Sequence, residues 1–279
     1  MSMKLKPISL SEHQELLYEI LYMFDDFCRE HGLRYFLVGG SLLGAVRHNA
    51  IIPWDDDIDV GMERSEYERF IELFKEKTPE GYCLLCMDTD PNYIIPFAKI
   101  GKCGTLQNQD CKNMPKSIPI NIDILPEDGC AGNTIEEADE YFRKIRTLIH
   151  GLVWWGFNEP LSLKPSKWRR SFRAIRYKVR YFSKEKVKKV YSEAKRYQVR
   201  DSKYFACLAW GLYPKGEVQL SSSILGELPL MRFGTRDIPV PGCWHEYLSG
   251  IYGNYMTPPP PEKRFRHSND DSSYLIINK

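Results

Sequence analysis

The sequence lacks the features that define several large protein classes. No apolar run approaches the roughly 20 residues that a membrane-spanning helix needs. The lysines near the start precede no apolar segment, so residues 1–10 do not resemble a secretory signal. We therefore expect a cytoplasmic protein. In that reducing compartment its 8 cysteines are not expected to build a disulfide framework.

Cysteine motifs are also scarce. Only Cys83 and Cys86 have the spacing of metal ligands, and no second CxxC pair follows them. A structural zinc at this pair is one interpretation. The other, which we favour, places Cys83 in a short strand over 82–87, where it packs as a small hydrophobic residue.

What is present indicates a folded protein with an uneven charge. Hydrophobic residues make up 43% of the 279 and charged residues 27%, which excludes disordered and fibrous chains. The net charge is +2, but residues 164–203 hold 16 Lys and Arg against 3 acidic residues, which leaves the remainder at −11. A basic segment beside an acidic body predicts an anionic partner. A solvated face of two helices is the alternative interpretation.

Apolar periodicity and capping residues predict an alternation of helices and strands. Ser9 and Glu12 form a capping box that begins a helix over 9–31, and Thr134 and Glu137 form another that begins a helix to about residue 150. Further helices are expected over 65–77, with Ser65 as its cap, and over 166–182, 184–200 and 244–252. Strands are expected over 35–38, 58–60, 82–87, 93–100 and 118–125.

These elements predict an α/β (α+β) fold with a mixed sheet core flanked by helices and a helical basic appendage. We expect three parts. Residues 1–128 form the core, residues 129–230 the basic helical appendage, and residues 231–279 a segment that packs back on the core.

The segment 52–60, IPWDDDIDV, carries the most informative acidic cluster. If it is a strand, Asp55, Asp57 and Asp59 point to one face, while Ile58 and Val60 face a core. Three neighbouring carboxylates repel one another unless a cation offsets their charge. Oxygen ligands at this density suit Mg²⁺ or Mn²⁺ better than zinc. A solvated acidic turn is the alternative.

A second strand supports the metal interpretation. Four isoleucines in the segment 118–124 share one face, which leaves Asn121 and Asp123 on the other. If this strand neighbours Asp57 and Asp59, then Asp123 is the third metal ligand or the general base. Otherwise it is an aspartate on the exposed face of a half-buried strand.

A glycine turn precedes the acidic cluster. Gly39, Gly40 and Ser41 lie between an apolar strand and a short helix, and such a junction offers free amide groups and a positive helix end to a phosphate. Arg47 and His48, at the end of that helix, carry charge that can pair with a phosphate.

Together these segments resemble a known family. GGSLLGAVRH at 39–48 and IPWDDDIDV at 52–60 resemble the signature of the LicD family of bacterial phosphocholine transferases, relatives of the fukutin-type transferases. The wider resemblance is to the nucleotidyltransferase fold, in which a Gly-Ser pair precedes an Asp-x-Asp pair and a later carboxylate. Asp57 and Asp59 match the pair, and Asp123 matches the later carboxylate. The segment 244–267 resembles the closing part of the family, with Asn254 where an aspartate is more usual.

The resemblance implies a reaction and roles for these residues. The donor would be CDP-choline and the acceptor a hydroxyl of a cell-surface glycan precursor, of teichoic acid or lipopolysaccharide type, with CMP released. Asp57, Asp59 and Asp123 would be catalytic, with Asp123 also accepting the acceptor's proton. The implied ligands of Mg²⁺, or alternatively Mn²⁺, are Asp55, Asp57, Asp59 and Asp123. The implied substrate-binding residues are Gly39, Gly40, Ser41, Arg47, His48 and Lys99.

The same resemblance implies what surrounds the reaction. Because choline is a quaternary ammonium ion, aromatic faces and carboxylates must hold it, and Trp54, Trp210 and Trp244 are candidates. Acceptors in this family are often lipid-linked, so residues 164–203 are expected to touch an anionic membrane surface, at the inner face of the plasma membrane.

Three other interpretations compete with this one. An alditol-phosphate transferase using a CDP-alditol would share the fold. A nucleic-acid-binding protein would use residues 164–203, but they lack a recognised base-reading motif, so we expect no nucleic-acid partner. An inactive scaffold is disfavoured because all three carboxylates are present.

Overall fold

The structure, a computed structural model, describes most of the chain outside one long internal segment. The described residues are 4–87, 89, 93, 95–108, 117–157, 189, 191–209, 211, 213, 216–264 and 272–277, with side chains omitted for 150–157. The predicted helix over 166–182 lies outside these residues, as do 184–188 and 190 of the one predicted over 184–200. In the described part of the latter, 189 and 191–194 are helical, but the chain turns at 195–197, so the helix does not continue to residue 200.

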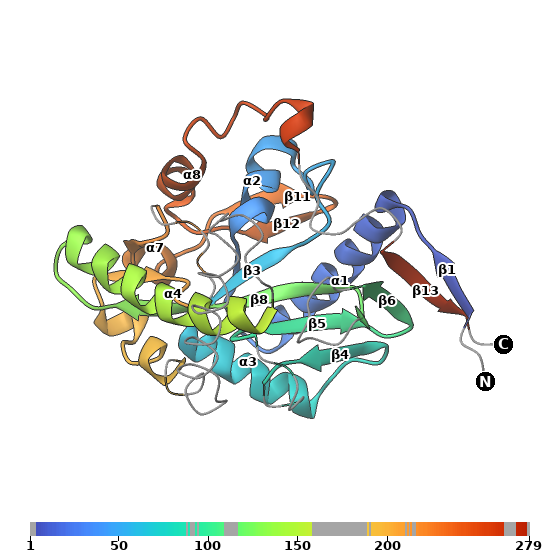
Figure 1. The fold of residues 1–279 in the computed structure, drawn as a ribbon, viewed down its shortest axis with the longest axis horizontal. Coiled ribbons are helices and arrows are strands. Elements are labelled where there is room, and N and C mark those ends of the chain that lie inside the picture. Colours follow the sequence, from blue (N-terminus) through green and yellow to red (C-terminus); the bar gives the residue numbers. More distant parts are fainter. Residues whose placement is uncertain are drawn as a thin grey trace, which may run out of the picture.

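Helices and strands are mixed along the chain (Figure 1). The helices are α1 (Leu10–Glu30), α2 (Gly39–His48), α3 (Arg64–Glu76), α4 (Ile135–Phe157), α7 (Ser222–Leu225) and α8 (Trp244–Tyr252), with short 3₁₀ turns at Val199–Asp201 and Pro261–Lys263. The strands are β1 (Lys4–Pro7), β2 (Phe36–Leu37), β3 (Asp59–Glu63), β4 (Tyr82–Leu85), β5 (Ala98–Lys102), β6 (Thr105–Asn108), β7 (Ser117–Ile118), β8 (Asn121–Cys130), β9 (Tyr204–Ala206), β10 (Gln219–Leu220), β11 (Leu230–Phe233), β12 (Arg236–Pro239) and β13 (Ser273–Ile277).

A seven-stranded mixed sheet forms the centre of the molecule. Its long strand β8 pairs in parallel with β3, and β3 continues antiparallel to β2. On its other edge β8 pairs antiparallel with β5 along its first half and with β9 along its second half. The expected mixed sheet flanked by helices is therefore confirmed.

The main core lies between this sheet and helices α1 and α3. Leu17, Ile20 and Phe24 of α1 are fully buried and pack in the same cluster as Ile122 and Ile124 of β8. Figure 1 shows α1 passing behind β5 and β8. The predicted isoleucine face is confirmed, because all four isoleucines of 118–124 are at most 4% exposed. Its burial leaves the alternate side chains of β8 on the opposite face.

The sheet runs across residue 128, where the sequence suggested a domain boundary. Strands β9 and β10 come from the segment 129–230 and extend the sheet beyond β8. Helix α4 covers them, with Phe142 and Ile145 packed in a cluster with Tyr204 and Ala206. The division into three parts stays a prediction.

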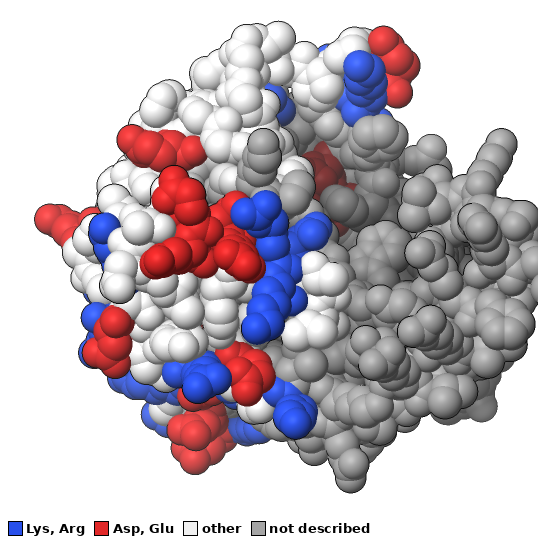
Figure 2. Space-filling view, turned by 60° about the vertical axis from the view of Figure 1, so that its left-hand side comes forward, with Lys and Arg blue, Asp and Glu red and all other residues white. Residues whose placement is uncertain are grey.

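Helix α4 begins with acidic residues. Its first turn contains Glu136 and Glu137, and Arg143 and Lys144 follow two turns later. Acidic groups in the first turn of a helix interact favourably with the positive end of the helix dipole. On the side of the molecule turned forward in Figure 2, acidic and basic side chains likewise lie in adjoining groups.

The two ends of the described chain meet in a second sheet. Strands β1 and β13 pair antiparallel, and β13 continues to β6 and β7. Figure 1 shows β1 and β13 side by side near both termini.

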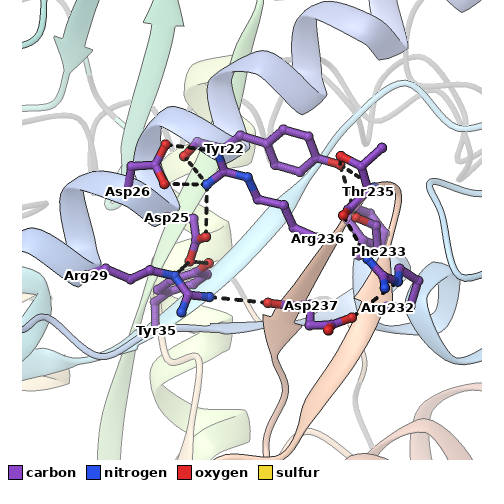
Figure 3. Close-up of polar contacts among 10 residues, drawn as sticks. All are labelled: Tyr22, Asp25, Asp26, Arg29, Tyr35, Arg232, Phe233, Thr235, Arg236 and Asp237. Atoms are coloured by element: carbon purple, nitrogen blue, oxygen red, sulfur yellow. Dashed lines mark hydrogen bonds and ion pairs between the residues drawn. The ribbon is translucent and has the colours of Figure 1, made fainter.

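A polar network fastens the β11–β12 hairpin to α1 (Figure 3). Asp25, buried on α1, accepts hydrogen bonds from the Tyr35 hydroxyl at 2.7 Å, from Arg29 Nε at 2.8 Å and from Arg236 of β12 at 3.2 Å. Arg236 also donates to Asp26, at 2.9 Å from its second terminal nitrogen. The hairpin in turn supports α2, because Phe233 packs beside Gly44.

Most predicted elements are confirmed, with local corrections. Both capping boxes form, at Ser9 with Glu12 and at Thr134 with Glu137, although α4 continues to Phe157. The prediction that Ser65 caps α3 was wrong, because Glu63 is the N-cap and Ser65 lies in the first turn. The strand expected over 93–100 begins only at Ala98, after Pro96, which has no amide hydrogen to donate.

A further correction concerns the acidic segment. The structure does not place Asp55 and Asp57 in a strand, since β3 begins at Asp59. The Asp55 amide donates to the Ile52 carbonyl at 2.8 Å, so the chain turns there before it enters the sheet. The predicted alternation of buried and exposed side chains is confirmed only at the end of the segment, where Ile58 and Val60 are fully buried and Asp59 is not.

Candidate active site

The structure brings two of the predicted carboxylates together on neighbouring strands. Asp59, at the start of β3, is the direct partner of Asp123 on the parallel strand β8. The Asp123 amide donates to the Ile58 carbonyl at 2.9 Å, which fixes this register. Since directly paired residues point to the same face of a sheet, both carboxylates lie opposite the isoleucine core.

The glycine turn lies directly against these carboxylates. Gly39 has a left-handed backbone (φ 54°), and a Cβ added there would meet Asp59 Oδ2 at 3.4 Å. A Cβ at Gly40 would meet Asp55 Oδ2 at 3.1 Å, which is tighter than most real Cβ contacts. The two glycines thus let the N-terminus of α2 approach the acidic groups. Free amides at a helix N-terminus favour anions, so this end of α2 can hold phosphate oxygens beside the carboxylates.

Ser41 connects the helix to the strand. Its buried hydroxyl accepts a hydrogen bond from the Asp59 amide at 2.9 Å. The residue therefore positions the start of β3, a role that the sequence pattern did not reveal.

Burial and mutual repulsion act on the carboxylates. Burial, followed by the charges of Asp59, Asp55 and Asp123, raises the pKa of Asp57 well above its usual range. The pKa of Asp59 is raised to about 8 by burial and by Asp123, while Lys99 opposes the shift. A bound cation would offset this repulsion.

The donor set fits magnesium in its chemistry. All the acidic side chains present oxygen, which Mg²⁺ and Mn²⁺ prefer. Within the described residues, however, no three His, Cys, Asp or Glu side chains already converge as a closed metal cluster. The residues that would hold a metal here are Asp57, Asp59 and Asp123, with Asp55 beside them at Gly40.

Lys99 is placed at the site by β5. It is the direct partner of Asp123 across the antiparallel β5–β8 pair. Its ammonium group forms an ion pair with the Asp123 carboxylate and donates to Asn121 Oδ1 at 3.1 Å. The lysine is 12% exposed, so it brings a positive charge into a largely enclosed site.

Arg47 and His48 lie at the other end of α2. The Arg47 guanidinium donates to the Tyr255 carbonyl at 2.8 Å and to His48 Nε2 at 3.0 Å. Burial lowers the pKa of both side chains, and Arg47 adds to the effect on His48. These contacts tie α2 to the segment after α8, and a direct phosphate contact of either residue stays a prediction.

Two of the three candidate tryptophans, Trp54 and Trp244, lie in the described part of the chain. The Trp54 ring is covered by the Arg264 guanidinium, 4.3 Å from its centroid. Trp244 packs against the core, and Trp210 lies outside the described residues. A choline-binding role for these three residues stays a prediction.

Three tyrosines and two glutamates that the sequence analysis did not single out lie close to the site. Tyr247, on α8, is half-buried, and its hydroxyl accepts a hydrogen bond from the Gly39 amide at 3.3 Å. The sequence feature that could have identified two of them is the segment resembling the closing part of the family, which contains Tyr247 and Tyr252. The additional residues are Glu127, Tyr213, Glu217, Tyr247 and Tyr252.

The favoured interpretation of Cys83 is confirmed in part, because the residue lies in a strand but does not belong to the main core cluster. Cys86 is buried in the main core, and Cys83 lies in β4, half-buried. The described residues contain no metal cluster that includes them.

Within the part of the chain that the structure describes, none of the helices is both long and apolar enough to cross a membrane. The basic segment 164–203 falls mostly outside the described residues, so its contact with an anionic surface stays a prediction.

Comparison with known proteins identifies relatives of this site. Residues 32–89 match the family described as LicD/FKTN/FKRP, nucleotidyltransferase domain. The lipopolysaccharide cholinephosphotransferase LicD of Haemophilus influenzae is 30% identical over 271 residues, which cover 94% of this chain and 97% of that protein. The human ribitol 5-phosphate transferase FKRP is 68% identical over 31 residues, which are 11% of this chain and 6% of that protein.

Proposed function

Because the chain belongs to the LicD family, we propose that it transfers phosphocholine to a hydroxyl group of a cell-surface glycan. The relative from Haemophilus, named for phosphocholine transfer to lipopolysaccharide, matches nearly the whole chain. The structural observation that carries the proposal is the pairing of Asp59 with Asp123 beside the glycine turn. Carboxylates next to a phosphate-binding helix end suit phosphoryl transfer.

The proposed donor is CDP-choline and the proposed acceptor is a lipid-linked glycan precursor of lipopolysaccharide or teichoic acid type. An acceptor hydroxyl oxygen attacks the phosphorus atom that carries choline. The bond from this phosphorus to the bridging oxygen of the diphosphate breaks, and CMP leaves with the bonding electrons. The hydroxyl proton passes to a carboxylate of the site, for which Asp123 is our candidate.

The chain's own residues then have separate tasks. The N-terminal end of α2 at Gly40 holds phosphate oxygens, and Ser41 keeps Asp59 in place. Lys99 neutralises charge on the diphosphate and orients Asp123 through their ion pair. Positioning and charge neutralisation supply most of the rate in phosphoryl transfer.

A divalent metal completes the proposal. Mg²⁺, or Mn²⁺ in its place, would be held by Asp57, Asp59 and Asp123, with Asp55 as a further ligand. When bound, it supplies positive charge that stabilises the diphosphate as the leaving group forms.

An alditol-phosphate transferase is the second candidate. The short match to FKRP, a protein named as a ribitol 5-phosphate transferase, is the observation that favours it. The two candidates share the catalytic residues and differ in the group that the donor carries.

The cellular setting follows from the proposed acceptor. We propose that the enzyme works in the cytoplasm at the inner face of the plasma membrane, where residues 164–203 contact anionic lipid. Each Lys or Arg near such a surface contributes about 1 kcal/mol before screening. Flotation with vesicles containing phosphatidylglycerol tests this: the full chain should float at low salt and be released as salt rises.

The donor is tested by incubating the full chain with Mg²⁺ and either CDP-choline or CDP-ribitol, and by measuring CMP. Release of CMP from CDP-choline supports the proposal. Release from CDP-ribitol alone would remove choline and leave the alditol candidate.

A further inference from the structure

A group of tyrosines and glutamates adjoins the carboxylates on the far side of the glycine turn. The Tyr213 and Tyr252 rings meet edge to face, with centroids 5.3 Å apart at 74°. Tyr247 lies on the same helix as Tyr252 and accepts from the Gly39 amide. Since Gly39 also touches Asp59, this aromatic group borders the reaction site directly.

A close backbone contact joins Glu217 to these tyrosines. A Cβ at Gly216 would lie 2.4 Å from the carbonyl carbon of Gly250 on α8, so the two chain segments touch there without room for a side chain. This contact holds Glu217 beside α8. The Glu217 carboxylate accepts from the Tyr213 amide at 3.2 Å, and its charge raises the pKa of Tyr247 after the larger effect of burial. Burial and then Tyr213 raise the pKa of Tyr252, and Asp59 and Glu217 add to this effect.

A second buried carboxylate belongs to the same group. Glu127, on β8, is 4% exposed, and a Cβ at Gly61 of β3 would meet its Oε1 at 3.0 Å. Gly61 is two residues from Asp59 on β3, and Glu127 is four residues from Asp123 on β8. The side chains of Asp59, Asp123 and Glu127 therefore lie on the same face of the sheet, opposite the isoleucine core. Burial, and then the charge of Glu217, raises the pKa of Glu127 well above its usual range.

Among the described residues, Glu127 has no counterion of its own. Within that part of the chain its carboxylate forms no hydrogen bond and no ion pair, while Arg64, the arginine whose charge influences it, is engaged by Asp128 at 2.7 Å. Glu217 differs, because its charge also acts on Arg146 of α4. A buried carboxyl group without a partner takes up a proton unless a cation arrives to stabilise its charged form.

We infer that this group of tyrosines and glutamates binds the quaternary ammonium group of the donor, an inference that rests on the proposed function. The residues that would bind it are Tyr213, Tyr247, Tyr252, Glu127 and Glu217. A trimethylammonium ion has no proton to donate, so aromatic faces and buried carboxylates are what recognise it. A neutral alditol gains no charge attraction from the two glutamates and no cation–π contact from the rings, so this pocket favours the cationic donor.

The test measures CDP-choline turnover by the full chain carrying Tyr252→Leu or Glu127→Gln. We expect the KM for CDP-choline to rise about tenfold in each, with kcat within about twofold, because a contact equal in ground and transition states acts on KM alone. Tyr252→Phe keeps the ring, and its KM should stay within about threefold of the natural protein. Competitive inhibition by CMP, which lacks choline, should be unchanged and shows that the rest of the site is intact.

Tyr141→Leu is the matched control. This tyrosine packs against Tyr197 on the α4 side of the molecule, so the variant should keep the KM of the natural protein. A KM for CDP-choline unchanged in both Tyr252→Leu and Glu127→Gln would overturn the pocket and leave the proposed reaction standing.

Calorimetry with choline chloride and phosphocholine distinguishes the opposite case, in which the proposed reaction fails and the pocket is correct. If the natural protein does not turn over CDP-choline but binds phosphocholine, and Tyr252→Leu weakens that binding, the proposed reaction fails and the pocket stands. If neither compound binds in calorimetry and no CDP-choline is turned over, both are overturned.

Discussion

Asp59 and Asp123 are direct partners on the parallel strands β3 and β8. The Ser41 hydroxyl holds Asp59 in place by accepting a hydrogen bond from its backbone amide at 2.9 Å. The distance in sequence between these residues is large, and only the parallel pairing brings their carboxylates to one place. Gly39 and Gly40, the first two residues of α2, lie against Asp59 and Asp55. The candidate site thus depends on backbone register as much as on the acidic side chains.

Ser41→Ala removes the acceptor of the Asp59 amide. Leaving a buried amide without a partner costs about 1–3 kcal/mol in the free energy of unfolding, and we expect a loss of activity because Asp59 is no longer fixed. Urea unfolding and CMP release measure the two effects. Ser9→Ala is the control: it removes the exposed cap of α1, costs about 1 kcal/mol and should leave activity unchanged.

Lys99→Met removes the positive charge beside Asp123. We expect kcat/KM for CDP-choline to fall at least about tenfold, since a preorganised charge at the diphosphate is lost. Lys102 on the same strand pairs instead with Glu19, away from the site, so Lys102→Met should retain full activity. Equal activity in the two variants would remove Lys99 from the site.

Asp128→Asn breaks a buried ion pair that joins β8 to α3. Arg64 and Asp128 are both at most 1% exposed and are joined by two hydrogen bonds of 2.7 Å. Removing one partner leaves the other charge buried and unpaired, and we expect a loss of about 3–5 kcal/mol in the free energy of unfolding. The double variant Arg64→Met with Asp128→Leu should be more stable than Asp128→Asn, and a double variant that is less stable would contradict this explanation.

Asp25→Ala tests the network that anchors the β11–β12 hairpin (Figure 3). Its loss leaves the buried Tyr35 hydroxyl and Arg236 without their shared acceptor, so we expect destabilisation of about 3 kcal/mol or more. Asp26 also pairs with Arg236 but is 63% exposed, and Asp26→Ala should cost less than about 1 kcal/mol. Thermal unfolding of the two variants checks the difference, and similar losses would show that Asp25 is not the anchor.

The sequence was sufficient for features that depend on local patterns. The capping boxes at Ser9 and Thr134 and the isoleucine stripe of β8 are encoded by neighbouring residues, so periodicity and capping preferences find them. Asp59 and Asp123 were also found, because an aspartate on a strand whose other face is apolar is unusual. Each strand turns its apolar side chains to the same core, so the two aspartates lie together on the opposite face of the sheet.

Other features depend on contacts between distant segments and left no local signal. Glu217 reaches the site only because Gly216 touches Gly250 of α8. The Arg64–Asp128 pair and the joining of β9 to the central sheet arise in the same way. The error at Asp55 and Asp57 has a local cause, since the turn after Ile52 outweighs the alternation that suggested a strand.

The most direct test of the proposed reaction is CMP release from CDP-choline and Mg²⁺ by the full chain and by its Asp57→Ala and Asp59→Ala variants. Loss of either carboxylate removes a ligand that would hold the metal against the diphosphate, and we expect turnover to fall at least about a thousandfold. Circular dichroism should show that both variants remain folded. Folded variants with the turnover of the natural protein would contradict the central claim that this acidic cluster carries the reaction.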